Sequence, residues 1–356
     1  MAGRRTRSGV TANQVTAVRI AAMPGMAWLL YQGEAGQWAA LAIAVAVALT
    51  DTLDGYLARK HGPTVLGSLL DPIADKLFIV ALFVPFVHLG YFPFVPVALI
   101  FLRELLVTAL RTAYERRGVR FRTSYLAKVK TWVQMQGAIT VLAFRLIGDS
   151  RATAWVLAAF TVAVAAGAAF AWARERRLRR GPWIMVGACA AVDATLWLGG
   201  VDVASSAIVV AIVALTWLSA VDYFTAGVRE LAARGRPGWS PADAARVAGA
   251  IALPGLVIAV VVVTRLPVWI PVAILAFELA LGGLDNLLAH HRAAAGALEW
   301  GLRTLGTAAL VAAGVIASRA GAPGWALWLV SAGLAVSVIG GVREFRRGSH
   351  YYLAQG

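Results

Sequence analysis

The chain is built from long apolar blocks that recur along its whole length. Clear examples are residues 39–50, 154–172 and 208–220. Of the 356 residues, 60% are hydrophobic and only 14% are charged, which is far from the balance of a soluble domain. A transmembrane helix needs about 20 mostly apolar residues to cross a hydrocarbon core of roughly 30 Å. The sequence therefore predicts an all-α, polytopic membrane helix bundle.

About twelve segments are expected to cross the membrane as helices. Their approximate limits are 14–32, 36–55, 69–89, 92–112, 126–147, 152–173, 182–199, 204–225, 244–264, 267–288, 299–318 and 323–342. Basic residues gather in alternate connections, such as 111–130, 174–180 and 229–236, while the other connections carry almost none. This asymmetry follows the positive-inside rule. It predicts that both termini are cytosolic, and we expect the plasma membrane as the location.

The formal net charge of +15 would suggest nucleic acid as a partner if the protein were soluble. Here the basic residues lie in short loops beside apolar spans, where membrane topology and anionic lipid headgroups account for them. We therefore expect membrane lipid, and no nucleic acid, as a partner.

The most informative segment holds four acids within 25 residues, at the cytosolic ends of the second and third expected helices. Its defined positions are Asp51, Asp54, Gly55, Ala58, Arg59, Gly67, Asp71 and Asp75. Asp51 and Asp54 are three residues apart, and Asp71 and Asp75 are four apart, so each pair shares one helix face. Two neighbouring helices can thus direct four carboxylates to one place.

Carboxylates crowded near lipid repel one another and are costly. A divalent cation relieves that cost, and hard oxygen ligands suit Mg²⁺ or Mn²⁺. Two such ions are a common device for displacement at phosphorus. The small residues Gly55, Ala58 and Gly67 leave room for a base or a diphosphate, although they also permit tight helix packing. Arg59 offers a fork of donors for phosphate oxygens.

The ordered set D-x2-D-G-x2-A-R-x7-G-x3-D-x3-D resembles the motif of the CDP-alcohol phosphatidyltransferase family, and every defined position is present. The resemblance implies a six-helix membrane bundle whose polar cavity opens to the cytosol. It assigns two metal ions to Asp51, Asp54, Asp71 and Asp75, and the CDP moiety to Gly55, Ala58, Arg59 and Gly67. It also makes Asp75 the general base on the acceptor hydroxyl, whose oxygen attacks the β-phosphorus of CDP-diacylglycerol so that CMP leaves.

Segments 13–24, 103–111, 127–135 and 219–224 look like the branch of the family that uses glycerol 3-phosphate as acceptor, the phosphatidylglycerophosphate synthases. A phosphorylated acceptor needs cations beside the metal site, and Arg111 and Lys128 are the candidates. The alternative is that both simply follow the positive-inside rule. Arg103 lies deeper and is expected to face the bundle interior. Its neighbour Glu104 is expected to point elsewhere, so that the two need not form an ion pair.

Other functions stay open at this point. Within the family, the acceptor could be phosphatidylglycerol, as in cardiolipin synthase, or an inositol phosphate. Outside it, many helices and an internal repeat are also typical of transporters, and a non-catalytic relative is a further alternative. A transporter or a non-catalytic relative would release no CMP, whereas every phosphatidyltransferase of the family would.

The resemblance covers roughly residues 10–147 and 204–227, so we divide the chain into a catalytic domain, 1–230, and a C-terminal region, 238–356. Residues 148–203 look like an added helix pair. Residues 13–31 align with 243–261, with Pro24 facing Pro254, which indicates either a duplication or a chance match of apolar sequences. The second copy keeps only Asp285 of the four acids and cannot build a two-metal site. Relatives are often homodimers, and a fused copy could replace that partner.

Overall fold

The computed structural model describes residues 12–61, 65–117, 125–175, 180–233, 240–290 and 297–353. These residues form helices joined by short turns, with no strand among them. The helices are α1 (Ala12–Leu29), α2 (Gly33–His61), α3 (Val65–His88), α4 (Phe94–Arg116), α5 (Tyr125–Ile147), α6 (Ser150–Glu175), α7 (Arg180–Ala233), α8 (Pro241–Val263), α9 (Trp269–His290), α10 (Ala297–Arg319) and α11 (Pro323–Leu353).

Helix α7 is two helices joined at Gly200. Its backbone there has φ 74° and ψ −169°, a conformation open mainly to glycine because a Cβ would clash. The chain reverses at this point, and the Oγ of Ser150 accepts a hydrogen bond from the amide of Val201 at 3.2 Å. Each half of α7 corresponds to one of the helices expected from the sequence.

The prediction of a polytopic all-α membrane bundle is confirmed, but the count of twelve spans is not. By length and composition, seven helices of the described chain qualify as membrane spans, and one of these, Gly181–Thr225, covers both halves of α7. Helices α1, α3, α4 and α5 are absent from this set. Polar and charged side chains such as Arg19, Arg103 and Lys130 interrupt the apolar sequence of α1, α4 and α5. Helix α3 is strongly apolar in its second half but carries Asp71, Asp75 and Lys76 in its first half.

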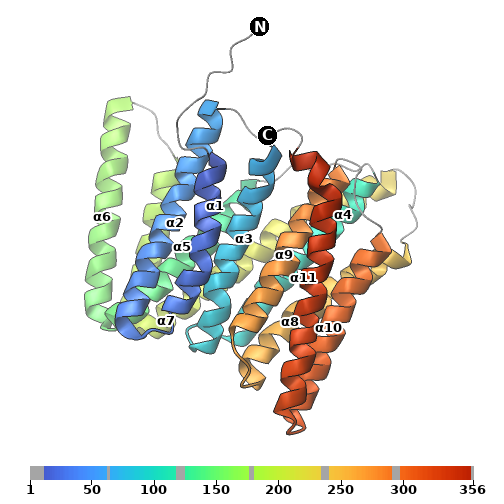
Figure 1. Cartoon of the computed structure of the whole chain (residues 1–356). Helices are drawn as coiled ribbons and strands as arrows, with labels where there is room; N and C mark the ends of the chain where they lie inside the picture. The colour runs from blue at the N-terminus through green and yellow to red at the C-terminus, as the bar shows by residue number, and fades with distance from the viewer. Residues whose placement is uncertain are drawn as a thin grey trace.

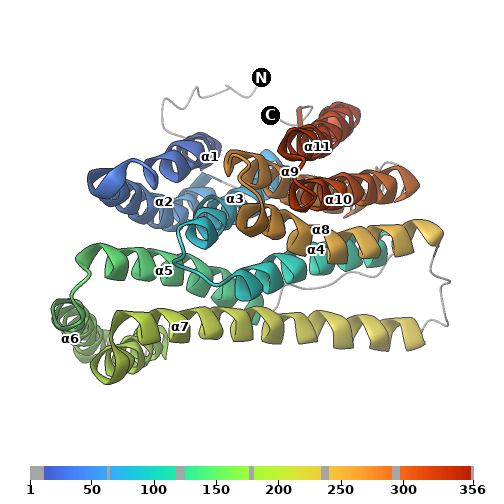
Figure 2. The ribbon, with the colours of Figure 1, turned by 90° about the horizontal axis from the view of Figure 1, so that it is seen from below.

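The start of α1 lies at the same end of the bundle as the end of α11 (Figure 1). The helices differ in tilt, since α6 is upright in Figure 1, whereas α4 and α7 are seen along their length in Figure 2. Helix α6 stands at one edge, where it packs on α7 and touches α5. On the other side, α8 packs on α10 and α4, while α9 packs on α3 and α4. Figure 2 shows α8–α11 grouped beside α3 and α4. Helices α8 and α9 therefore cover α3 and α4.

One apolar core joins the two parts of the chain. It runs from Met26 in α1 through Phe83 and Phe101 in α3 and α4 to Leu253 and Val311 in α8 and α10. Side chains of both parts thus exclude solvent and lipid from the same interior.

We predict that Gly200→Ala lowers the free energy of unfolding by about 1–3 kcal/mol, because alanine would be forced into a strained backbone conformation. A Cβ at this position would also lie 2.9 Å from the Oγ of Ser150. Thermal unfolding in detergent micelles measures the effect. Gly167→Ala in α6 is the control, since nothing lies within 4 Å of its Cβ position and alanine favours a helix. Equal stabilities for the two variants would contradict the role given to Gly200.

Candidate functional site

The two halves of the acidic motif meet at the end of the bundle where α1 begins. The first half lies on the last turns of α2, which ends at His61, and the second half lies on the first turns of α3, which begins at Val65. The side chains of Asp51, Asp54, Gly55, Ala58 and Arg59 lie outside the described residues. Gly67, Asp71 and Asp75 are described, and the structure places all three on α3.

Side chains of helix α1 form hydrogen bonds with Asp71 and Asp75 of α3. The Oγ1 of Thr16 donates to the Oδ1 of Asp71 at 3.0 Å, and the Nη2 of Arg19 donates to the Oδ1 of Asp75 at 3.4 Å. Thr16 and Arg19 are both fully buried, with exposed fractions of 0% and 2%. Their separation of one helical turn matches that of the two acids. Segment 13–24 thus orients the carboxylates of α3.

Asp71 and Asp75 fit a divalent cation by their chemistry. They are half-buried carboxylates on one face of α3, and hard oxygen donors suit Mg²⁺ or Mn²⁺. Among the described side chains, no group of three or more His, Cys, Asp or Glu could hold a metal ion. Asp51 and Asp54 fall outside that search, although α2 is helical throughout their positions. The four-acid metal site therefore stays a prediction.

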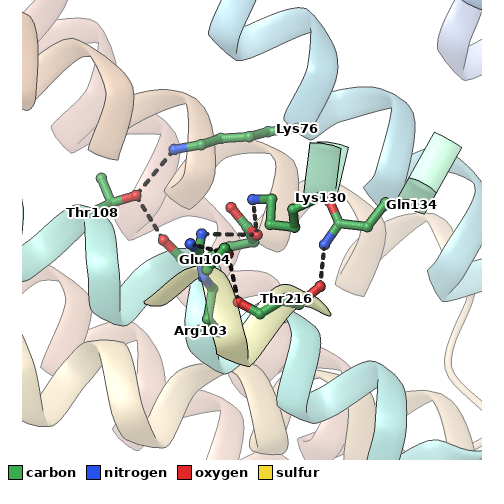
Figure 3. Close-up of polar contacts among 8 residues, drawn as sticks. Lys76, Arg103, Glu104, Thr108, Lys130, Gln134 and Thr216 are labelled. Atoms are coloured by element: carbon green, nitrogen blue, oxygen red, sulfur yellow. Dashed lines mark hydrogen bonds and ion pairs between the residues drawn. The ribbon is translucent and has the colours of Figure 1, made fainter. Parts of the chain in front are cut away.

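A buried cluster of cations surrounds Glu104 on α4 (Figure 3). The Nζ of Lys130, from α5, donates to the Oε1 of Glu104, and the Nη1 of Arg103 lies 3.4 Å from the same oxygen. The Nζ of Lys76 donates to the Oγ1 of Thr108 at 3.1 Å. That hydroxyl in turn donates to the backbone oxygen of Glu104 at 2.6 Å. Three cationic side chains from α3, α4 and α5 thus converge beside Asp75.

The expectation that Glu104 points away from Arg103 was wrong. Adjacent side chains leave a helix in different directions, but both of these are long enough to bend toward the same buried space. An unpaired charge in that space would cost several kcal/mol. Pairing the carboxylate of Glu104 with both Arg103 and Lys130 is therefore favoured. The expectation that Arg103 faces the interior is confirmed, since its exposed fraction is 4%.

The second half of α7 closes this cluster. The Nη2 of Arg103 donates to the Oγ of Ser219 at 2.7 Å, and the Nε2 of Gln134 donates to the Oγ1 of Thr216 at 2.9 Å. Both hydroxyls are fully buried. Segment 219–224, which resembles the glycerol 3-phosphate branch, therefore begins at a residue that fixes Arg103.

The two predicted acceptor residues are placed differently. Arg111 lies on α4 with a side chain 33% exposed, and its Nε donates to the Oε1 of Glu115 at 3.0 Å. The side chain of Lys128 lies outside the described residues. Lys76 and Lys130 were missed by the sequence analysis. Lys76 follows Asp75 directly and opens a long apolar run, and a charge in such a place is itself a functional signal.

Among the described residues of the second half of the chain, no copy of the acid cluster is present. Asp285, the surviving acid, is buried between two arginines, with Arg116 at 3.1 Å and Arg246 at 3.1 Å. Glu278 lies in a separate network with Arg303, Thr304 and Ser337. Both carboxylates are thus neutralised by neighbouring side chains.

Comparisons with known proteins agree with the motif. The model of the CDP-alcohol phosphatidyltransferase family matches residues 9–167. A probable phosphatidylglycerophosphate synthase of Mycobacterium tuberculosis is 37% identical over 163 residues, which cover 44% of this chain and 77% of the relative. The chain belongs to the CDP-alcohol phosphatidyltransferase family.

Other relatives carry a more explicit name. A CDP-diacylglycerol–glycerol-3-phosphate 3-phosphatidyltransferase of Pseudomonas fluorescens is 32% identical over 173 residues, covering 47% of this chain and 87% of the relative. One of Cereibacter sphaeroides with the same name is 38% identical over 136 residues, covering 36% and 61%. No solved structure matches the chain. The protein is thus an enzyme of the CDP-alcohol phosphatidyltransferase class, and this family generally uses divalent metal ions.

We predict that Glu104→Gln lowers the free energy of unfolding by about 3–5 kcal/mol, because it leaves buried cations without their carboxylate. Unfolding in detergent measures the loss. Glu34→Gln, at an exposed position of the first turn of α2, is the control and should be neutral. Adding Lys130→Met to Glu104→Gln should recover part of the loss. A Glu104→Gln protein as stable as the parent would contradict a charge-paired cluster.

Proposed function

We propose that the protein transfers the phosphatidyl group of CDP-diacylglycerol to glycerol 3-phosphate, releasing CMP and forming phosphatidylglycerophosphate. The observation that carries this proposal is the cation cluster beside Asp75. Arg103 and Lys130 pair with the carboxylate of Glu104, and Lys76 is linked to the backbone oxygen of Glu104 through Thr108. Three cations thus share one carboxylate, which leaves an excess of positive charge near the acidic motif. The names of the relatives support the same acceptor.

The excess positive charge favours a phosphorylated acceptor. Glycerol 3-phosphate brings a dianionic phosphate to the site, and a desolvated phosphate needs fixed cations to replace its water. Phosphatidylglycerol, the acceptor of a cardiolipin synthase, brings a single negative charge within a lipid. An inositol phosphate would also use the cations, so only an acceptor comparison separates it from glycerol 3-phosphate.

The motif residues divide the work of the reaction. Asp51, Asp54, Asp71 and Asp75 would hold divalent ions, two Mg²⁺ or Mn²⁺, which when bound supply positive charge against the diphosphate. Gly55, Ala58 and Gly67 would let the CDP moiety approach the backbone, and Arg59 would donate to its phosphate oxygens.

Asp75 would accept the proton of the acceptor hydroxyl. The freed oxygen forms a bond to the β-phosphorus, and the bond between that phosphorus and the oxygen bridging to CMP breaks. Arg19, beside Asp75, holds the carboxylate in place before the acceptor arrives. Arg111 and Lys128 would bind the acceptor phosphate, with Lys76 and Lys130 adding to the positive field.

We also propose the orientation and the domain division. The motif end of the bundle would face the cytosol at the plasma membrane, as the basic connection 111–130 and the common end of α1 and α11 suggest (Figure 1). Residues 1–230 would form the catalytic domain, with 148–203 as an added helix pair. Residues 238–356 would be a degenerate repeat, supported by Pro24 and Pro254 inside α1 and α8. A homodimer is a further proposal.

We predict that purified protein releases CMP from CDP-diacylglycerol with Mg²⁺ or Mn²⁺ and glycerol 3-phosphate. Asp75→Asn should lower this rate by about 100-fold or more, since general-base catalysis contributes that much. Product analysis should give phosphatidylglycerophosphate. CMP release that requires phosphatidylglycerol or an inositol phosphate would overturn the acceptor, and no release with any acceptor would overturn the proposed reaction.

We also predict that Arg111→Ala and Lys128→Ala each raise the KM for glycerol 3-phosphate about tenfold, because each removes a charged donor to phosphate. The KM for CDP-diacylglycerol and the metal dependence should not change. Steady-state kinetics with varied acceptor provide the measurement. Arg265→Ala, at an exposed position in the turn between α8 and α9, is the control. An unchanged acceptor KM in both variants would exclude the assigned role.

A further inference from the structure

The C-terminal region, which the family model does not cover, reaches the end of α4 that carries Arg111. The Nη2 of Arg116 lies 3.1 Å from the Oδ1 of Asp285 on α9. The Nη2 of Arg117 donates to the Oδ2 of Asp243 on α8. Two consecutive arginines at the end of α4 are thus tied to two different C-terminal helices.

Helix α9 also packs behind the motif helix. Ile73, between the two described acids of α3, joins the apolar cluster formed by Leu281, Leu284 and Leu288. A Cβ placed on Gly283 would lie 3.4 Å from the Cγ1 of Ile73, so the two helices are close here. Asn286 is one turn further along α9. It therefore lies on a helix that contacts α3 through Ile73 and α4 through Arg116.

Asn286 joins the ion pair that holds Arg111. With its amide nitrogen turned toward Glu115, it donates to the two carboxylate oxygens at 2.8 and 3.3 Å, and its amide oxygen accepts from the Nε of Arg111 at 3.3 Å. The opposite amide orientation would set like groups against each other. Asn286 thus bridges both members of the pair.

This bridge leaves the Arg111–Glu115 contact incomplete. A guanidinium and a carboxylate favour a bidentate pair with two parallel hydrogen bonds. Of the nitrogens of Arg111, the Nε is the one that donates to Glu115, while the amide of Asn286 contacts both oxygens of the carboxylate. No hydrogen bond from a described residue engages the Nη1 or Nη2 of Arg111, and its side chain is 33% exposed. Both terminal nitrogens therefore remain available to a phosphate.

We propose that Asn286 is a positioning residue for the acceptor site: it occupies the carboxylate of Glu115 so that Arg111 offers its terminal nitrogens to the acceptor phosphate. The proposal rests on the proposed function, in which Arg111 binds glycerol 3-phosphate. It gives the C-terminal region a share in acceptor binding, although that region carries no motif. Without the amide, Glu115 would close a bidentate pair with Arg111 and compete with the phosphate.

The test compares Asn286→Ala with the parent enzyme in steady-state kinetics. We expect the KM for glycerol 3-phosphate to rise about five- to tenfold, the worth of one or two hydrogen bonds, with the KM for CDP-diacylglycerol unchanged. Adding Glu115→Gln to Asn286→Ala should reverse most of this rise, because the competing charge is gone. A purely structural role predicts instead that the double variant is worse than either single variant and that both KM values change.

Two further variants keep the result interpretable. Ser337→Ala removes a buried hydrogen bond to Glu278 within the C-terminal region and should leave both KM values unchanged. Asn286→Ser keeps a short hydrogen-bond donor and should raise the KM for glycerol 3-phosphate less than Asn286→Ala does. If the alanine variant does not fold, the serine variant still tests the proposal. An unchanged acceptor KM in Asn286→Ala and Asn286→Ser overturns the proposal.

Arg111→Ala distinguishes a failure of the positioning role of Asn286 from a failure of the acceptor role of Arg111. If Arg111→Ala raises the acceptor KM and Asn286→Ala does not, the positioning role is wrong and the acceptor assignment stands. If Arg111→Ala leaves the acceptor KM unchanged, the assignment of Arg111 in the proposed function fails first. In the Arg111→Ala background, Asn286→Ala should have no further effect on this KM.

Discussion

Charge buried in a membrane bundle must be matched by opposite charge or by hydrogen bonds, because lipid offers neither. Every part of this site reflects that requirement. Glu104 is almost completely buried and would be untenable alone, yet it is surrounded by Lys130, Arg103 and the hydrogen-bonded pair of Lys76 and Thr108. The cations are equally dependent on it. Several cations can therefore be kept inside this apolar bundle because they share the carboxylate of Glu104.

The same requirement explains how the second half of the chain differs from the first. In the first half, acids on α3 meet Thr16 and Arg19 but keep oxygens half-exposed, as ligands for a cation must be. In the second half, Asp285 is enclosed by Arg116 and Arg246. Arginines there occupy the electrostatic role that a metal ion would otherwise fill. The buried carboxylates of the second half are thus neutralised by arginines, and its helices pack against α3 and α4.

Much of the fold and part of the site could be predicted from the sequence. Apolar blocks and their polar breaks located the helices, including the break at Gly200, because lipid imposes a fixed length on each element. The acids of the motif were found because their helical spacing is visible in one segment. The Glu104 cluster was not, because its members come from three helices and meet only through packing. Arg103 and Glu104 were expected to diverge, and the contact of Asn286 with Arg111 and Glu115 likewise forms only because α9 packs on α4.

The shared core of the two parts has a consequence for assembly. Where a neighbouring chain covers a helix face, dilution separates the two chains. The fraction of complete sites then depends on the concentration of the protein in the membrane. Here α8 and α9 are on the same chain as the faces of α3 and α4 that they cover. The effective concentration of the covering helices is fixed by the chain itself. The support of Arg111 by Asn286 is therefore equally complete in a cell that makes few copies of the enzyme and in one that makes many.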